Sequence, residues 1–292
     1  MFKRSEVERG VAWWESQGYC VKLADGVFDN DDWVAGDAAG RARDLAALFA
    51  DPEIDAVQCF RGGYGSAQLI PHLDFDAVAA NPKPFVGFSD ITALHTSIRQ
   101  RTGLASFYGP NLISVGHPDA TELTHAQLLA RLRGATGEVP RPPEDPYVRG
   151  IVGGRVTAPL VGGCLWLLVQ TMGTPWEFQA GGSILFFEDV NLHAWYLDGF
   201  LLQLLAAGKF DGIVGIVVGE MADCDFPERR SGFPRVKSVE EVLEIRLGGL
   251  GIPVLYGLPL GHGKHLATLP IGVTCTLDGD TRTLTVDEPA VR

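Results

Sequence analysis

The chain has 292 residues, which is long for one core and comfortable for two, since domains typically hold about 100–200 residues. Hydrophobic residues make up 46% and charged residues 21%, so enough apolar surface can be buried to exclude a mostly disordered protein. The net charge is -12 and the pI is near 5.0, which argues against a basic face for nucleic acid. No apolar run approaches the roughly 20 residues that span a bilayer, and the amino terminus lacks the apolar stretch of a signal peptide, so we expect a cytoplasmic protein without a membrane partner.

In the first half of the chain, short apolar runs alternate with helical patterns. The periodicity predicts helices over residues 6–17, 38–50 and 91–101. It predicts strands over residues 20–23, 56–60 and 84–88. Strands separated by helices need crossover connections, and these indicate a mainly parallel sheet. We therefore expect residues 1–130 to form a Rossmann-like α/β domain with helices on both faces.

The second half continues after a segment rich in glycine and proline, residues 131–157, which we interpret as a linker. Beyond it, helices are predicted over residues 161–171, 197–207 and 239–247. Strands are predicted over residues 183–188, 212–218 and 253–256, and a terminal hairpin over residues 274–277 and 283–286 with its turn at residues 278–280. Residues 158–292 are therefore expected to form a second α/β domain that ends in antiparallel strands.

Ser89 lies at a corner between a predicted strand and a predicted helix, in the run VGFSDIT (residues 86–92). Such a corner holds a hydroxyl clear of the sheet, and N–H groups at the helix start can stabilise an oxyanion. The alternative is that Ser89 or Asp90 only caps the helix, and the local sequence by itself favours this role. The G-x-S-x-G elbow of the α/β hydrolases is not matched, because position 91 is Ile.

A glycine-rich loop follows the predicted strand at residues 56–60, in the run RGGYG (residues 61–65). Glycines such as Gly62 and Gly63 let backbone amides approach a ligand closely, although a tight connecting turn explains them equally well. Glu188 and Asp189 end another predicted strand, at the sheet edge where ligands gather in open α/β folds. A solvated strand end is the simpler interpretation of that pair when it is taken alone.

His262 stands between two glycines in a loop after a predicted strand, where it has room to meet a substrate. Together with His265 it could bind a metal, but no third ligand follows at close spacing, so we expect no metal and no other cofactor. His72 and His95 are interpreted as structural. A serine nucleophile needs a base, and the base needs a carboxylate to orient it. The chain offers Ser89, His262 and Glu188 for these three roles, although their order in the sequence does not prove that they meet.

Several runs, taken together and in chain order, resemble the LD-carboxypeptidase family of serine peptidases, which includes muramoyl-tetrapeptide carboxypeptidases and microcin C immunity-type hydrolases. They are RGGYG (61–65), VGFSDIT (86–92), YGP (108–110), LVGG (160–163), Gly-Thr-Pro (173–175), ILFFED (184–189), Gly-His (261–262) and LPIG (269–272). The resemblance implies two domains, usually a homodimer, and a triad with Ser89 as nucleophile, His262 as base and Glu188 orienting the base. It also implies an oxyanion hole made by the backbone amides of Asp90, Gly62 and Gly63.

The chain also departs from the family pattern. Family members usually open with a strand before the first helix, whereas this sequence begins in the helix, and we expect about 10–20 further residues upstream of Met1. Cys164 replaces an asparagine of the family, and the pattern after Glu188-Asp189 is altered over residues 191–199. We expect hydrolysis of an L,D-amide bond at the end of a murein tetrapeptide. The alternatives are hydrolysis of an aminoacyl- or peptidyl-nucleotide, and a non-catalytic protein that binds a small ligand.

Overall fold

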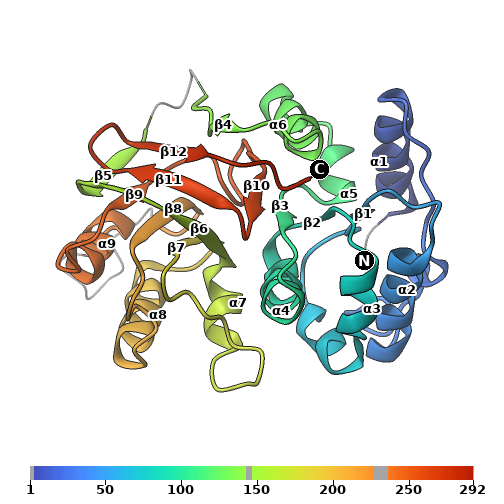
Figure 1. Ribbon diagram of the computed structural model, residues 1–292, viewed down its shortest axis with the longest axis horizontal. Coiled ribbons are helices and arrows are strands. Elements are labelled where there is room, and N and C mark those ends of the chain that lie inside the picture. Colours follow the sequence, from blue (N-terminus) through green and yellow to red (C-terminus); the bar gives the residue numbers. More distant parts are fainter. Residues whose placement is uncertain (1–2, 143–146, 226–235, 292) are drawn as a thin grey trace.

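The computed structural model describes residues 3–142, 147–225 and 236–291 (Figure 1). Their strands form two sheets flanked by helices, in the orders β1-β2-β3-β10 and β4-β12-β11-β6-β7-β8-β9-β5. This arrangement confirms the predicted α/β class. None of the described helices is long and apolar enough to cross a membrane.

The first sheet is parallel except at one edge. Its strands are β1 (Val57–Gln58), β2 (Phe85–Gly87), β3 (Ser106–Tyr108) and β10 (Leu269–Ile271). Strand β10 comes from the far end of the sequence and pairs antiparallel with β3. The second half of the chain therefore contributes a strand to the first sheet. The predicted division into residues 1–130 and 158–292 did not include this exchange.

Two layers of helices enclose the first sheet, each with its own apolar cluster. One layer contains α1 (Arg4–Ser16), α5 (Leu112–Val115) and α6 (Glu122–Leu132). The other contains α2 (Ala38–Ala50), the 3-10 segment η2 (Ser66–His72), α3 (Phe75–Ala80) and α4 (Thr92–Thr102). A short 3-10 segment, η1 (Asp25–Phe28), precedes α2.

Capping residues explain where two of these helices begin or end. At the start of α2, Asp37 accepts a hydrogen bond from Gly40 N, and Gly103, with a φ of 74°, ends α4.

The second sheet has a parallel centre and antiparallel edges. The parallel strands are β6 (Arg155–Cys164), β7 (Ile184–Val190), β8 (Gly215–Ala222) and β9 (Val254–Tyr256). The antiparallel strands are β4 (Gly137–Glu138), β5 (Arg149–Val152), β11 (Thr274–Asp278) and β12 (Thr283–Val286). One face packs against α7 (Leu165–Gln170), α8 (Ala194–Ala206) and α9 (Val239–Leu247), and the other shares a core with β3 and β10.

Three local predictions need correction. Residues 161–164 were predicted as helix but end strand β6, where they pair in register with residues 185–188. A short apolar run in a buried strand cannot be told from a buried helix by periodicity alone. Residues 20–23 were predicted as a strand, yet no strand includes them. The segment interpreted as a linker, residues 131–157, also contributes β4 and β5, which lie at the two edges of the second sheet, and the first residues of β6.

Candidate active site

Ser89 lies in a single 3-10 turn, η3 (Ser89–Ile91), between the end of β2 and the start of α4. Its φ of 65° is a left-handed backbone conformation that residues with a side chain adopt at a cost. Two hydrogen bonds hold it there: Ser89 N donates to the Tyr108 hydroxyl at 3.0 Å, and the Thr92 hydroxyl donates to Ser89 O at 2.7 Å. The strand-to-helix corner expected from the sequence is therefore present, and its strain is supported by specific partners.

The glycine-rich loop lies directly against this corner. A Cβ atom on Gly62 would be only 2.9 Å from Ser89 Cβ, so the close approach requires glycine. A Cβ atom on Gly63 would instead meet only the Arg61 side chain within the described residues. The buried Asp90 carboxylate fixes the loop, because it accepts hydrogen bonds from Ser66 N at 2.8 Å and from the Ser66 hydroxyl at 2.5 Å.

Glu188 is fully buried in β7, and both of its carboxylate oxygens accept hydrogen bonds. Oε1 accepts from the Tyr108 hydroxyl at 2.5 Å. Oε2 accepts from His262 Nδ1 at 2.7 Å and from the backbone N of His262 at 3.2 Å. Gly261 permits this contact, since its φ is 111° and a Cβ atom there would be 2.1 Å from Glu188 Oε2. The carboxylate therefore holds both the ring and the backbone of His262.

The imidazole of His262 is mostly buried, and its ring centroid lies 5.0 Å from that of Phe88, the residue before Ser89. Burial by itself would lower the pKa of His262, but the hydrogen bond and charge of Glu188 and the charge of Asp189 together raise the pKa above its ordinary value. Because Nδ1 donates to Glu188, the neutral ring keeps Nε2 free of a proton. No hydrogen bond joins the Ser89 hydroxyl to His262 among the described residues; such bonds often tighten only when substrate binds.

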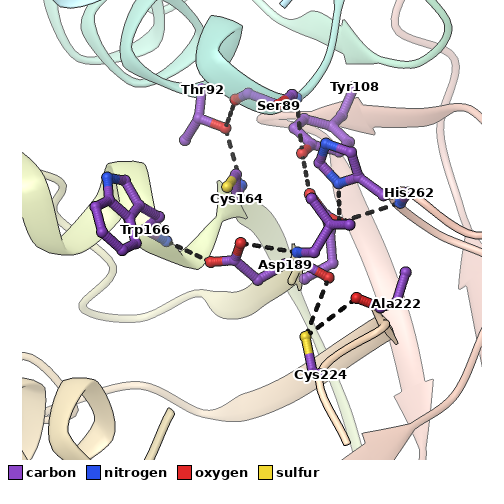
Figure 2. A network of polar contacts seen from close by, with 11 residues as sticks. Ser89, Thr92, Tyr108, Cys164, Trp166, Asp189, Ala222, Cys224 and His262 are labelled. Carbon is purple, nitrogen blue, oxygen red and sulfur yellow. Dashed lines mark hydrogen bonds and ion pairs between the residues drawn. The ribbon is translucent and has the colours of Figure 1, made fainter. Parts of the chain in front are cut away.

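A second buried carboxylate, Asp189, adjoins Glu188. Its oxygens accept hydrogen bonds from Trp166 N and Val190 N, each at 2.8 Å (Figure 2). Burial is the main cause that raises the pKa of Asp189 to about 6. Nearby, Cys164 N donates to the Thr92 hydroxyl at 2.9 Å, so strand β6 of the second sheet is bonded to helix α4 beside the first. This last bond joins the two halves of the chain at the site.

The structure thus brings Ser89, Glu188 and His262 into one network, with Tyr108 between them. The other histidines singled out from the sequence lie elsewhere. His265 Nδ1 lies 3.0 Å from the Thr121 hydroxyl, while the buried His95 ring contacts the Ser106 hydroxyl and Gly87 O. No group of three or more potential metal ligands occurs in the described part of the chain.

Sequence reasoning missed Tyr108, and it gave no role to Thr92. Tyr108 is fully buried at the end of β3, and its hydroxyl is the direct link between Ser89 N and Glu188. The sequence did carry a signal, because Tyr108 opens the run YGP (108–110) that belongs to the resemblance, but no role was assigned to it. A cavity of about 330 Å³ opens beside the site and is lined by Phe88, His262 and Lys264 among others. Its size lies at the lower end of that of small-molecule sites, which span roughly 300–1,000 Å³.

The site lies near the carboxyl ends of the parallel strands β2 and β7, and comparison with known proteins defines the family of the chain. The model of the LD-carboxypeptidase N-terminal domain matches residues 1–109, and that of the LD-carboxypeptidase C-terminal domain matches residues 157–277. The chain belongs to the LD-carboxypeptidase family. It is a hydrolase of the serine carboxypeptidase type, as the sequence motifs led us to expect.

Relatives of two kinds resemble the chain over most of its length. The murein tetrapeptide carboxypeptidase of Pseudomonas aeruginosa is 33% identical over 253 residues, which cover 85% of this chain and 80% of the relative. The muramoyltetrapeptide carboxypeptidase of Oxalobacter formigenes has a crystal structure that superposes with a TM-score of 0.85 at 27% identity, covering 99% of this chain and 96% of the other.

The second kind is the microcin C7 self-immunity protein MccF of Escherichia coli, which is 31% identical over 310 residues, covering 96% of this chain and 87% of the relative. The structure of MccF in complex with glutamyl sulfamoyl guanosine superposes with a TM-score of 0.88 at 27% identity, covering 98% of this chain and 92% of the other. The two kinds of relative therefore share one fold with this chain.

Proposed function

We propose that this chain hydrolyses the L,D-amide bond at the end of a murein tetrapeptide, with Ser89 as nucleophile, His262 as general base and Glu188 as the group that orients the base. The observation that carries the proposal is the continuous hydrogen-bonded path from Ser89 N through Tyr108 to Glu188 and on to His262 Nδ1. This path leaves Nε2 as the ring nitrogen that can accept a proton.

In the first half of the reaction, His262 Nε2 takes the proton of the Ser89 hydroxyl while Oγ attacks the carbonyl carbon of the scissile amide. The carbonyl oxygen becomes an oxyanion, and the backbone N–H groups of Asp90, Gly62 and Gly63 are the proposed donors to it. Gly62 supports this role because it lies against Ser89. Glu188 stabilises the imidazolium that forms.

The tetrahedral intermediate then collapses. The C–N bond breaks, and His262 Nε2 returns its proton to the leaving amine of the terminal D-amino acid, so that an acyl-enzyme remains on Ser89. Water enters, loses a proton to His262 and attacks the ester, and the peptide acid leaves as Ser89 regains its proton. Every proton in this cycle passes through His262 Nε2, which explains why Nδ1 must stay bonded to Glu188.

The murein substrate is supported by the relatives named as murein peptide carboxypeptidases. A second candidate is hydrolysis of an aminoacyl- or peptidyl-nucleotide, which the similarity to MccF and its glutamyl sulfamoyl guanosine complex favours. Both reactions would use the same triad. They differ in the substrate, either in its leaving group or in the group that binds next to the triad. A homodimer, which the family resemblance implies, stays a prediction that light scattering tests.

A panel of purified substrates separates these candidates: murein tetrapeptide, murein tripeptide and an aminoacyl sulfamoyl nucleotide. We expect release of D-alanine from the tetrapeptide and no cleavage of the tripeptide. Cleavage of the nucleotide alone would support the second candidate. A protein that cleaves nothing in the panel and is not labelled at Ser89 by a fluorophosphonate would contradict both and favour a binding protein.

A further inference from the structure

Arg61 opens the glycine-rich loop that lies against Ser89. Its side chain is exposed, and within residues 3–142, 147–225 and 236–291 its guanidinium group takes part in no hydrogen bond or ion pair. The group lies beside Gly63, because a Cβ atom on that glycine would be 3.6 Å from Arg61 Nη2 and 3.7 Å from Nε. The proposed mechanism gives this cation no role.

The backbone that carries Arg61 is held on both sides. Before it, Phe60 O accepts a hydrogen bond from Ile113 N at 3.2 Å. After it, Gly65 O accepts a hydrogen bond from Arg41 Nη1 at 3.0 Å. The guanidinium group of Arg41 is thus used to hold the loop, whereas that of Arg61 is available to a ligand.

The same loop sets the distance from Arg61 to the proposed nucleophile. A Cβ atom on Gly62 would be 2.9 Å from Ser89 Cβ and 3.3 Å from Ser89 Oγ. Since consecutive Cα atoms are about 3.8 Å apart, the Cα atom of Arg61 lies within about 8 Å of Ser89 Cβ. An extended arginine side chain spans such a distance. The guanidinium group can therefore reach a ligand bound at Ser89 without a shift of the backbone.

The proposed substrate carries a carboxylate close to the bond that Ser89 attacks. Only the scissile C–N bond, N–Cα and Cα–C separate the scissile carbonyl carbon from the terminal carboxyl carbon, so these two carbons lie within about 4 Å of each other. An enzyme that removes only the last residue must recognise this carboxylate. A guanidinium group suits it well, because the two can form a pair of parallel N–H···O bonds between opposite charges.

The charges nearest to Ser89 make a cation necessary for such a substrate. Asp90 follows the nucleophile and Glu188 holds His262, and both carboxylates are buried. Each repels a further carboxylate, and this repulsion is stronger in a partly buried site than in water. Arg61 can offset it at the place where the loop meets Ser89.

We propose that Arg61 binds the terminal carboxylate of the peptide substrate and thereby restricts cleavage to the last amide bond. Since this carboxylate belongs to the peptide that Ser89 is proposed to cleave, the role of Arg61 rests on the proposed function. A peptide that continues beyond the next residue would place an uncharged amide against the guanidinium group and would lose the ion pair. The charge at this one position thus separates the end of a peptide from its interior.

The test compares murein tetrapeptide with the same peptide carrying a carboxamide in place of its terminal carboxylate. The wild-type protein should cleave the acid with the higher kcat/KM. Arg61→Gln should lower the ratio of kcat/KM for the acid to that for the amide by about 10–100-fold, mainly through a higher KM for the acid. Arg61→Lys retains the charge but loses the paired hydrogen bonds, so it should lower the ratio by less. Arg133→Gln, at an exposed arginine that follows α6, is the matched control and should leave the ratio unchanged.

A binding measurement separates the role of Arg61 from the proposed function. In a Ser89→Ala background, which prevents turnover, N-acetyl-D-alanine should bind more tightly than N-acetyl-D-alaninamide in an NMR titration, and adding Arg61→Gln should remove the difference. A preference for the acid that depends on Arg61, found in a protein that cleaves neither peptide, would support this role and contradict the proposed function. A wild-type protein without that preference, or a preference that survives Arg61→Gln in binding and in cleavage, overturns the proposal.

Discussion

The hydroxyl of Tyr108 donates a hydrogen bond of 2.5 Å to Glu188, and through it the first sheet is joined to the second at the proposed active site. The same hydroxyl accepts the N–H of Ser89 at 3.0 Å. One phenol therefore sets the position of the serine backbone relative to the carboxylate that holds His262. Burial, and after it the negative charge of Glu188, raises the pKa of Tyr108, so the phenol stays protonated and can donate.

We predict that Tyr108→Phe lowers kcat by about 10–100-fold and leaves the fold intact, because Ser89 N loses its acceptor and Glu188 loses a donor. The loss of a buried hydrogen bond should also lower the free energy of unfolding by about 1–3 kcal/mol. Steady-state kinetics and chemical denaturation measure the two effects. Tyr147→Phe, at a half-exposed ring, is the matched control and should change neither quantity. Unchanged kcat in Tyr108→Phe would show that the phenol does not position the catalytic groups.

The pH dependence of kcat/KM should report the ionisation of His262. Only the neutral ring accepts the proton of Ser89, so kcat/KM should rise with pH through an apparent pKa above the ordinary value of about 6.5. Glu188→Gln removes the charge and the carboxylate that raise this pKa, so the rise should move to lower pH while the maximal rate falls by less than in Ser89→Ala. A profile that does not move in Glu188→Gln would contradict the pairing of the two residues.

A pair of glycine substitutions tests the contact between the glycine-rich loop and Ser89. Gly62→Ala would place a Cβ atom 2.9 Å from Ser89 Cβ, so the loop or the serine must shift, and kcat should fall by about 10²-fold. Gly199→Ala lies in α8, where an added Cβ meets nothing within 4 Å. This control should keep full activity and raise the free energy of unfolding by up to about 1 kcal/mol. Equal kinetics for the two variants would show that the loop does not act at Ser89.

Asp189 should titrate near pH 6 rather than in the usual range of aspartate. Its folded pKa, raised mainly by burial to about 6, exceeds the unfolded value of about 3.9. The stability that this group contributes is therefore fully present below about pH 4 and is lost as pH rises through about 6. Carboxyl NMR titration with Asp189→Asn as the assignment control measures the pKa. A midpoint below 4 would contradict the burial of this carboxylate.

Most elements of the fold follow from local chemistry that is visible in the sequence. Helix α2 runs over the predicted residues 38–50, and α9 over the predicted residues 239–247, because their apolar positions repeat at helical spacing and Asp37 and Ser238 cap them. The strand at residues 20–23 failed because a strand exists only with a neighbour to pair with, and pairing is not a property of the segment itself. Residues 161–164 were ambiguous for a different reason, since periodicity alone does not separate a short buried strand from a buried helix.

Residue type and position near strand ends singled out Ser89, Glu188 and His262 as candidates, and the resemblance grouped them into one site; the structure places them in one hydrogen-bonded network. Contacts between strands that are distant in the sequence could not be predicted. Tyr108 and Glu188 are separated by 80 positions, and their contact depends on how the sheets pack. Likewise, the sequence shows Thr92 only as a residue at the start of a helix. Its contact with Cys164 N depends on how strand β6 packs against that helix.

The proposed mechanism requires that Ser89 and His262 act as one unit. We therefore compare kcat for release of D-alanine from murein tetrapeptide in Ser89→Ala, His262→Ala and the double variant, with circular dichroism to verify that each is folded. We predict that each single variant loses about 10⁴–10⁶ in kcat and that the double variant loses no more than either. Substantial turnover by Ser89→Ala, or losses that multiply in the double variant, would contradict the triad.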